Sequence, residues 1–545
     1  MRARHRSLIA LVLAACGGRG DAPEAEATAP PPSSSASASV AALGSASGGT
    51  TTTTTADAAA APVSSSTPLV ALDGATRAPL PVPSEGPRLA ARGISVPVRD
   101  QPEPEAKIVG WLRAGAIVAR SAEPAGKAGC KGGWYSIDPA GYVCVDEKAT
   151  LDLDDPIVRA SSRRPDRSQK LPYMYGTVTR GGPVYGRIPT AEDLSKFEPS
   201  LRGHIDKWRR DEVSGAGYGL DVWFKWKEPP SYGAWEAWEE KLSDPELPWF
   251  LRDHAFVPDL SGAVKKAEGS AKIGQVDRRQ GAAFVDSVLV EGRRYNVTTD
   301  LRVVPADRYR PIRGSDYVGV RIGVDVKMPF ALVRRPGGKK WTLPAKGKRV
   351  EAGELPWRAA LQLTGKQKFA DGLLHYELED GSWVDDRHAS RIDPAKKMPK
   401  WGKNGEKWLD VNITKQVLVA YDGETPVYAT LVSTGESGLD DEGGRSTKKG
   451  IFRIHTKHVS ATMDSDVVGE EFELRDVPYV QYFEGGYALH AAYWHDSFGR
   501  PKSHGCINLS PEDARRLFHF TEPSVPDHWH GAARALTGTV IFVHP

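Results

Sequence analysis

The sequence is poor in cysteine, in net charge and in long apolar runs. Its 545 residues include 4 cysteines, and 72 Lys and Arg are balanced by 69 Asp and Glu, giving a formal net charge of +3. Basic residues are spread among acidic ones, so the composition gives no case for nucleic-acid binding. Beyond the N-terminus no apolar run is long enough to cross a bilayer, and we therefore expect no membrane-spanning helix.

The N-terminus carries a short apolar run of its own. A basic head, Met1 to Arg6, precedes the apolar stretch Leu8 to Ala15, which has the form of a secretion signal rather than a membrane span. Leu13-Ala14-Ala15-Cys16 resembles a bacterial lipobox, which implies cleavage before Cys16 and lipidation of its thiol. The alternative is an ordinary signal peptide with an incidental cysteine. We expect an exported protein, lipid-anchored in the cell envelope, on the periplasmic side if the host has an outer membrane.

Residues 17–90 consist largely of Ala, Ser, Thr, Pro and Gly, with an unbroken threonine run from Thr50 to Thr55. Such a segment buries too little apolar surface to offset its conformational entropy, so we predict a disordered tether. About 450 residues then remain for three or four domains.

Residues 91–150 contain short apolar runs separated by Gly and Pro turns, among them Val96–Arg99 and Trp134–Ile137. The pattern predicts a small antiparallel barrel. It resembles the bacterial Src-homology-type barrel, a wall-binding module. Cys130 and Cys144 flank its last two predicted strands, and in an exported domain of this size we expect a disulfide rather than two free thiols.

Residues 151–400 are β-like but harder to interpret. Strand-turn-strand signals occur at 178–188 and 284–305, and a second barrel is suggested at 329–393. We interpret the tryptophans between these parts as core residues rather than a ligand platform; they are Trp208, Trp223, Trp226, Trp235 and Trp238. The whole chain is therefore predicted to be mainly β and multidomain.

Residues 403–545 form the last predicted domain. Three strands are expected at 408–413, 416–421 and 425–432, the last two around an Asp422-Gly423 turn. A helix is predicted to begin with Ser510 as its cap and Pro511 at its first position, and to end near Phe518. A closing strand is expected at 537–543.

The chemistry of this domain is concentrated in Ser503-His504-Gly505-Cys506-Ile507-Asn508 and the upstream His490. A cysteine nucleophile needs a thiolate, an imidazole that takes its proton, and amide donors for the oxyanion formed when a carbonyl is attacked. Cys506, His490 and the amides of Gly505 and Cys506 supply these groups, and Gly505 has no side chain to obstruct a substrate carbonyl.

This motif resembles the catalytic motif of the L,D-transpeptidases of the YkuD type, and the strands at 408–432 look like the opening strands of that fold. The resemblance implies that Cys506 is the nucleophile and His490 the general base, and that His504, Gly505 and Cys506 shape the oxyanion site. It also implies that Ser503, Trp494 and Asn508 line the substrate site, with no cofactor or metal.

Two positions depart from the family pattern. Ala491 stands where some members have a Ser that orients the histidine, so only a backbone carbonyl is available locally for that role. Lys448 stands where Pro is common, after Thr447. Two other interpretations of the motif remain: a buried structural cysteine, and a zinc site formed by His490, His495, His504 and Cys506. We interpret His495 as a structural or rim histidine rather than a second base.

The resemblance implies an enzyme that forms a Cys506 thioester with a peptidoglycan tetrapeptide stem and transfers it to an amine, which cross-links or remodels the wall. Its expected partners are stem peptides and, through the lipid, a membrane. Water can take the same thioester, which would make the protein an L,D-carboxypeptidase or endopeptidase, because pocket shape and water exclusion choose the acceptor. The alternative from another class of function is a non-catalytic tether that binds the wall.

Overall fold

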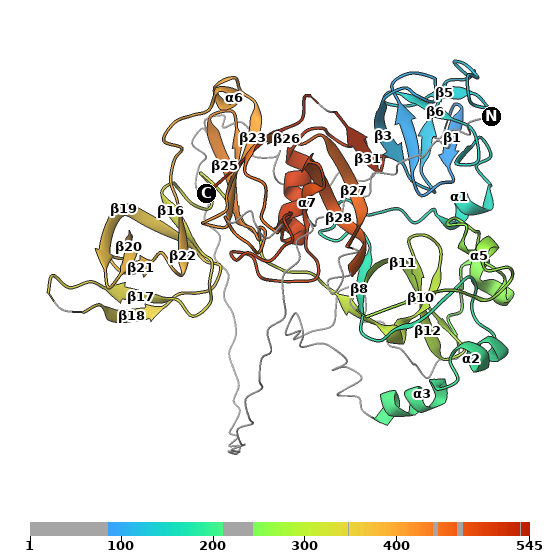
Figure 1. Ribbon diagram of the computed structural model, residues 1–545, viewed down its shortest axis with the longest axis horizontal. Coiled ribbons are helices and arrows are strands. Elements are labelled where there is room, and N and C mark those ends of the chain that lie inside the picture. The colour runs from blue at the N-terminus through green and yellow to red at the C-terminus, as the bar shows by residue number, and fades with distance from the viewer. Residues whose placement is uncertain are drawn as a thin grey trace, which may run out of the picture.

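The computed structural model describes residues 85–210, 243–278, 280–346, 348–439, 445–465, 472–534 and 536–545. The predicted signal peptide, Cys16, most of the 17–90 linker and Trp223, Trp226, Trp235 and Trp238 lie outside these residues, as does the side chain of Trp208. Strands dominate the described chain (Figure 1), which confirms the mainly β, multidomain fold class. Among the described helices, none is long and apolar enough to cross a membrane.

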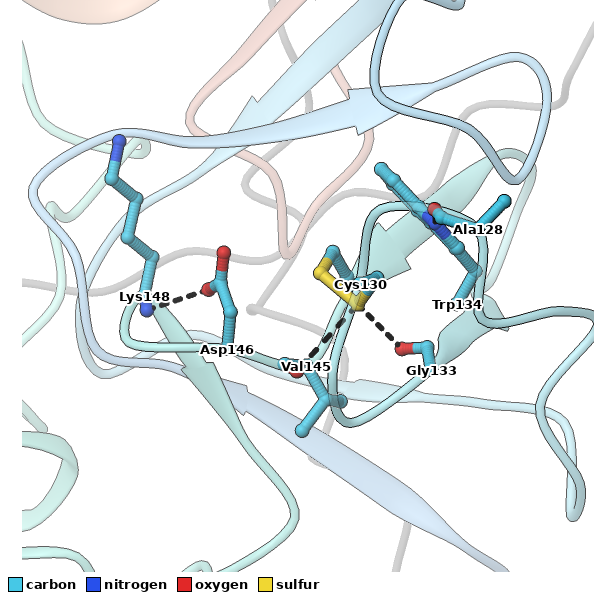
Figure 2. The surroundings of a disulfide bond; sticks show 8 residues. Ala128, Cys130, Gly133, Trp134, Val145, Asp146 and Lys148 are labelled. Atoms are coloured by element: carbon cyan, nitrogen blue, oxygen red, sulfur yellow. Dashed lines mark hydrogen bonds between the residues drawn. A yellow bond between two sulfur atoms is a disulfide. The ribbon is translucent and has the colours of Figure 1, made fainter.

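The N-terminal unit, residues 85–150, is made of short antiparallel strands in two sheets, ordered β4-β1-β7 and β3-β2-β6-β5. Its strands are β1 (Arg88–Ala91), β2 (Val96–Arg99), β3 (Ile108–Leu112), β4 (Ile117–Ala119), β5 (Trp134–Ser136), β6 (Tyr142–Cys144) and β7 (Ala149–Thr150). Val96 and Val98 of β2 are buried while Pro97 and Arg99 are half-buried, the alternation of a strand with one face on a core. Cys130 and Cys144 form a disulfide with an S–S distance of 1.97 Å, which ties β6 to the loop before β5 (Figure 2).

The middle unit, residues 151–312, combines two groups of antiparallel strands with short helices. Its elements are α1 (Pro156–Ala160), β8 (Met174–Val178), β9 (Gly182–Tyr185), α2 (Ala191–Phe197), α3 (Leu201–Arg210), η2 (Trp249–His254), α5 (Ala263–Lys266), β10 (Lys272–Val276), β11 (Gly281–Val290), β12 (Arg293–Thr298), β13 (Val303–Pro305), η3 (Ala306–Arg308) and β14 (Tyr309–Ile312). β9 to β13 pair in the order β10-β9-β13-β12-β11, and β8 joins β11 to β14.

The second β unit, residues 329–393, is a seven-stranded sheet in the order β18-β17-β21-β20-β19-β16-β22. Its strands are β16 (Phe330–Val333), β17 (Lys339–Thr342), β18 (Val350–Glu354), β19 (Ala360–Ala370), β20 (Leu373–Leu378), β21 (Trp383–Asp385) and β22 (Ala389–Ile392). Ala331, Val333, Leu363, Leu378 and Val384 form part of its own buried core. The strands therefore fill the range in which the sequence suggested a second barrel.

The C-terminal domain, residues 403–545, has two sheets with helix α7 packed into their shared core. Its elements, with the preceding α6 (Lys400–Lys403) and β15 (Val320–Arg321), are β23 (Lys407–Asn412), β24 (Val417–Asp422), β25 (Thr425–Leu431), β26 (Gly450–Arg453), β27 (Thr456–Ser465), β28 (Phe472–Glu484), β29 (Tyr487–Ala491), β30 (Ile507–Leu509), α7 (Pro511–Phe520), β31 (Gly531–Ala533) and β32 (Val540–His544). One sheet runs β15-β25-β24-β23-β32-β26, and the other contains β28, β27, β31, β29 and β30.

Helix α7 begins as the sequence predicts. The Ser510 hydroxyl accepts a hydrogen bond from the Asp513 amide at 3.2 Å, and Pro511 occupies the first turn, where no intrahelical donor is needed. The helix continues to Phe520, two residues past the predicted end, because Phe518 and Phe520 are both buried in the core. The closing strand begins at Val540 rather than at 537.

The accessory units join the C-terminal domain through paired strands and a buried carboxylate. β31 pairs with both β27 and β3, and Gly281 of β11 pairs with Leu474 of β28. Asp476 accepts from Arg113 of the N-terminal unit, from Thr299 of the middle unit at 2.5 Å and from Ser460 at 2.7 Å. Figure 1 shows the second β unit on one side of the C-terminal domain and the other two units on the opposite side.

Candidate active site

Two adjacent parallel strands bring the predicted nucleophile and base onto one face. In the register of β29 and β30, Leu489 lies opposite Ile507 and His490 opposite Asn508. Leu489 and Ile507 point into the core with α7. Because side chains alternate between faces, His490 and Asn508 point the other way, and Cys506, two residues before Asn508, shares that face. Residues 16 positions apart in sequence therefore lie on one face of these two strands.

Cys506 is the free cysteine among the described residues, and it is 7% exposed. It packs in a cluster with Ala488, Tyr493 and Tyr175 of the middle unit. Its Sγ lies 3.8 Å from the carbonyl oxygen of Gly486. The thiol thus lies in a mainly apolar setting at the edge of the C-terminal domain, where the middle unit covers it on one side.

His490 is oriented by the carbonyl of Ala491. Its Nδ1 lies 3.3 Å from Ala491 O, and because a carbonyl only accepts, Nδ1 carries the proton and Nε2 is left with a lone pair. Burial lowers the pKa of His490 to about 4, against an opposing effect of the Ala491 hydrogen bond. The ring is therefore a neutral base at neutral pH. Trp494 stacks on it, with ring centroids 5.7 Å apart.

The loop that carries Cys506 is held by two hydroxyl groups. Ser503 Oγ donates to the Cys506 carbonyl at 2.5 Å and accepts from the Gly505 amide at 3.1 Å. Thr447 Oγ1 donates to the Gly505 carbonyl at 2.7 Å and accepts from the Gly435 amide at 2.9 Å. Ser503 and Thr447 thus fix the backbone on both sides of the nucleophile.

The arrangement bears on the oxyanion site expected from the sequence. The Gly505 amide, which the sequence offers as an oxyanion donor, donates to Ser503 in this structure. The need for glycine at this position has a different cause: Gly505 has φ +127°, and a Cβ there would lie 2.7 Å from Cε1 of Tyr487. Gly505 therefore serves the path of the backbone.

His495 is a buried structural histidine, 1% exposed, and does not lie at the rim. Its Nδ1 accepts from the Ser497 amide at 3.2 Å, and its Nε2 lies 2.8 Å from the side-chain amide of Asn508. Burial, with smaller effects from the charges of Lys502 and His490, lowers the pKa of His495 to about 3. Asn508 therefore holds the loop between His490 and Cys506, and only part of its side-chain amide is left for a substrate.

His504 is half-buried. Burial, followed by the charges of Arg445 and Lys502, lowers the pKa of His504, and Glu436 opposes this. Within the part of the chain that the structure describes, no group of three or more His, Cys, Asp or Glu side chains is placed to hold a metal ion. His490, His495, His504 and Cys506 therefore do not converge as a zinc site would require.

The surroundings of the site include residues that sequence reasoning missed. Tyr175 of the middle unit packs on Tyr493 with ring centroids 4.6 Å apart, and its hydroxyl donates to the Asp476 carbonyl at 2.8 Å. Arg358 of the second β unit contacts Asp496 in the loop that follows His490. No local signal in the sequence marks Tyr175 or Arg358. Tyr175 lies 318 positions before Tyr493, and Arg358 lies 138 positions before Asp496.

Comparison with known proteins finds a family model and a relative that match the domain containing this motif. Residues 406–543 match the family model described as the L,D-transpeptidase catalytic domain. A curated relative, YciB of Bacillus subtilis (strain 168), is named provisionally as an L,D-transpeptidase. It is 26% identical over 152 residues, which cover 23% of this chain and 64% of that protein. The chain thus spans less than two thirds of that relative's length.

The solved structures to which part of this chain is similar include L,D-transpeptidases. That of Xylanimonas cellulosilytica DSM 15894 is 22% identical, covers 28% of this chain and 65% of that chain, and has a TM-score of 0.20. The structure from Mycobacterium smegmatis is 18% identical, and the match covers 38% of this chain and 77% of the other, with a TM-score of 0.21. The catalytic domain of the Enterococcus faecium enzyme is 20% identical, and the match covers 26% of this chain and 98% of the other, with a TM-score of 0.20.

Proposed function

We propose that this chain, whose residues 406–543 match the L,D-transpeptidase catalytic domain, is a cysteine acyltransferase that acts on peptidoglycan stem peptides. The observation that carries the proposal is the pairing of β29 with β30, which puts Cys506 on one face with His490, a neutral imidazole whose Nε2 has a lone pair. A thiol beside such a base is the arrangement that nucleophilic catalysis by cysteine requires.

In the first half-reaction Cys506 attacks the carbonyl carbon of the L,D-peptide bond before the terminal D-residue of a tetrapeptide stem. His490 Nε2 takes the thiol proton as the S–C bond forms, and the Cys506 amide donates to the resulting oxyanion. The oxyanion then collapses, the C–N bond breaks, and the proton on His490 passes to the leaving amine. The products are a free D-amino acid and a thioester on Cys506.

In the second half-reaction an amine, such as the side chain of a diamino acid on a neighbouring stem, attacks the thioester. His490 accepts a proton from the amine as the C–N bond forms, the C–S bond breaks, and the proton on His490 passes to the departing sulfur, which regenerates the thiol. The burial of Cys506 and His490 favours an amine over water, since a closed site limits hydrolysis of a reactive acyl group. The same thioester taken by water gives the carboxypeptidase or endopeptidase alternative.

The setting of the enzyme is also part of the proposal. We place the chain outside the cytoplasm, anchored in the envelope by a lipid on Cys16 and extended from it by the 17–90 linker. The Cys130–Cys144 disulfide supports an oxidising compartment, because such bonds are rare in reducing ones.

The test incubates purified protein with a synthetic tetrapeptide stem, with and without a diamino-acid stem as acceptor, and follows products by mass spectrometry. The proposal expects release of the terminal D-amino acid and an acceptor-dependent cross-linked product, both absent in Cys506→Ala. Release without any cross-link identifies the hydrolytic alternative. If protein that retains its fold releases no D-amino acid, the non-catalytic tether is the remaining interpretation.

A further inference from the structure

The second β unit reaches the active-site loop at Asp496. This loop, residues 492–505, connects His490 to Cys506, and it lies in a different unit from Arg358. We propose that Arg358 is a positioning residue for the catalytic pair, which acts by holding Asp496. The second β unit then completes the active site, a role separate from any binding to the wall.

The contact has three hydrogen-bonding components. Arg358 Nη2 donates to the backbone carbonyl of Asp496 at 2.9 Å and also pairs with its carboxylate. Ser315 Oγ donates to the same carboxylate from the segment between β14 and β15. The side chains of Arg358 and Asp496 are 15% and 22% exposed, so solvent screens this ion pair less than it screens a surface pair.

The backbone of Arg358 has a strained conformation. Its φ of +68° is unusual for a residue with a Cβ. The guanidinium lies over the rings of Trp357 at 3.8 Å and Tyr317 at 5.0 Å. Two aromatic rings and a backbone hydrogen bond from Arg358 to the Val333 carbonyl at 3.0 Å therefore fix a conformation that the chain does not prefer.

Asp496 lies next to the two residues that contact the catalytic strands. Trp494 stacks on His490, and His495 bonds Asn508, which is the register partner of His490 and lies two residues after Cys506. Displacement of Asp496 therefore moves the groups that hold His490 and β30.

The part of the loop that follows Asp496 is held by residues other than Arg358. Ser433 Oγ donates to the Ser497 carbonyl at 3.0 Å, and the Gly499 amide donates to the Val432 carbonyl at 2.9 Å. Both bonds lie within the C-terminal domain. Among the side chains that the structure describes, Arg358 and Ser315 donate hydrogen bonds to the Asp496 carboxylate, so loss of Arg358 leaves one of these two side-chain anchors.

The experiment measures how fast iodoacetamide alkylates Cys506, followed by mass spectrometry on the peptide that contains it, from about pH 5 to pH 9. This readout needs no substrate, so it tests the positioning role even if the proposed function fails. Arg358→Ala is expected to slow alkylation at neutral pH by about ten- to hundredfold and to shift its pH profile, because a displacement of about 1 Å has effects of that size. Arg335→Ala, an exposed arginine of the same unit, should stay within about twofold of wild type.

A double-mutant cycle separates this role from a general loss of stability. Asp496→Asn should slow alkylation as Arg358→Ala does, and the double variant should be no slower than the slower single variant. On a tetrapeptide substrate, Arg358→Ala should lower kcat and leave KM within about twofold. The proposal is overturned if the effects of the two single variants multiply in the double variant. It is also overturned if folded Arg358→Ala has the alkylation profile of the wild type.

Arg358→Lys decides the question if Arg358→Ala does not fold. Lysine keeps the charge but lacks the planar guanidinium, which lies over the rings of Trp357 and Tyr317 while its Nη2 contacts the carbonyl and the carboxylate of Asp496. The proposal expects a melting temperature close to wild type with alkylation slowed at least about threefold. A wild-type alkylation rate in this variant refutes a positioning role for Arg358.

Discussion

At the residue scale, the proposed mechanism makes Cys506 and His490 one unit, because the thiol gives its proton to the lone pair on His490 Nε2. Cys506→Ala is expected to abolish release of the D-amino acid. His490→Ala should lower it by about a thousandfold or more, and the double variant should be no worse than Cys506→Ala, since groups that act together are not additive. Mass spectrometry of released D-amino acid measures this. His519→Ala, an exposed histidine on α7, is the control and should keep full activity.

A second prediction at this scale concerns pH. The Nε2 base functions only while His490 is neutral, and burial lowers the pKa of His490 to about 4, well below the ordinary value of 6.5. Activity is therefore expected to persist as pH falls below 6.5 and to be lost as pH falls through about 4. The pH profile of kcat/KM for the free enzyme measures this limb. An acid limb centred near pH 6.5 would show that His490 is more exposed than the structure places it.

At the element scale, the loop before β26 and the loop before β30 are joined by Thr447, whose hydroxyl bonds both Gly435 and Gly505. Thr447→Val keeps the shape and removes both hydrogen bonds in a buried setting, so the free energy of unfolding should fall by about 1–3 kcal/mol. Because the Gly505 carbonyl directly precedes Cys506, kcat should fall as well, by about tenfold.

Thr447→Ser separates the hydroxyl from the methyl group, because it keeps both hydrogen bonds. It should restore most of kcat and of the unfolding free energy, measured by thermal melts and by D-amino acid release. Equal losses in the serine and valine variants would contradict a role for the hydroxyl alone, because serine keeps the hydroxyl and valine keeps the methyl group.

At the scale of the whole molecule, the N-terminal unit is both cross-linked and built into the C-terminal domain. Cys130 and Cys144 are separated by 14 positions, and closing a loop of this size stabilises a fold by about 3 kcal/mol. Replacing both with Ser should lower the unfolding free energy of the N-terminal unit by about that amount and leave turnover at low temperature unchanged.

The pairing of β3 with β31 adds a consequence for heat stability. Because the N-terminal unit extends a sheet of the C-terminal domain, the double Ser variant should also lose turnover at a lower temperature than wild type. Calorimetry and residual activity after heating measure the two effects. Ready alkylation of both cysteines in native, unreduced protein would contradict the disulfide.

The local elements of the C-terminal domain could be predicted because their signals lie within a few residues of one another. Alternating apolar residues predicted β23 to β25 within one or two residues, and Ser510-Pro511 predicted the start of α7. The chemistry of Cys506 was readable for the same reason, since Ser503 to Asn508 are contiguous. Even the absence of a hydroxyl at Ala491 correctly pointed to a backbone carbonyl as the partner of His490.

The middle unit shows which features local sequence signals could not predict. Its strands at 178–188 and 284–305 were visible, but their pairing order and their position against Tyr493 were not. β8 reaches β11 across about a hundred residues, and the buried ion pairs of Arg293 with Glu198 and Asp307 join residues from separate elements. Long-range pairings of this kind depend on which whole faces pack together, and no single residue records that choice.

The sequence by itself therefore determined the candidate reacting groups, the class of fold and the ends of the main elements, because hydrophobic period, capping and motif spacing are local properties. Only the tertiary structure decided that the Gly505 amide donates to Ser503, that Tyr175 packs against Tyr493, and that Arg358 holds Asp496. Each of these depends on atoms brought to within a few ångströms by packing of separate units. The distance between two atoms in the folded chain is not a property of either segment alone.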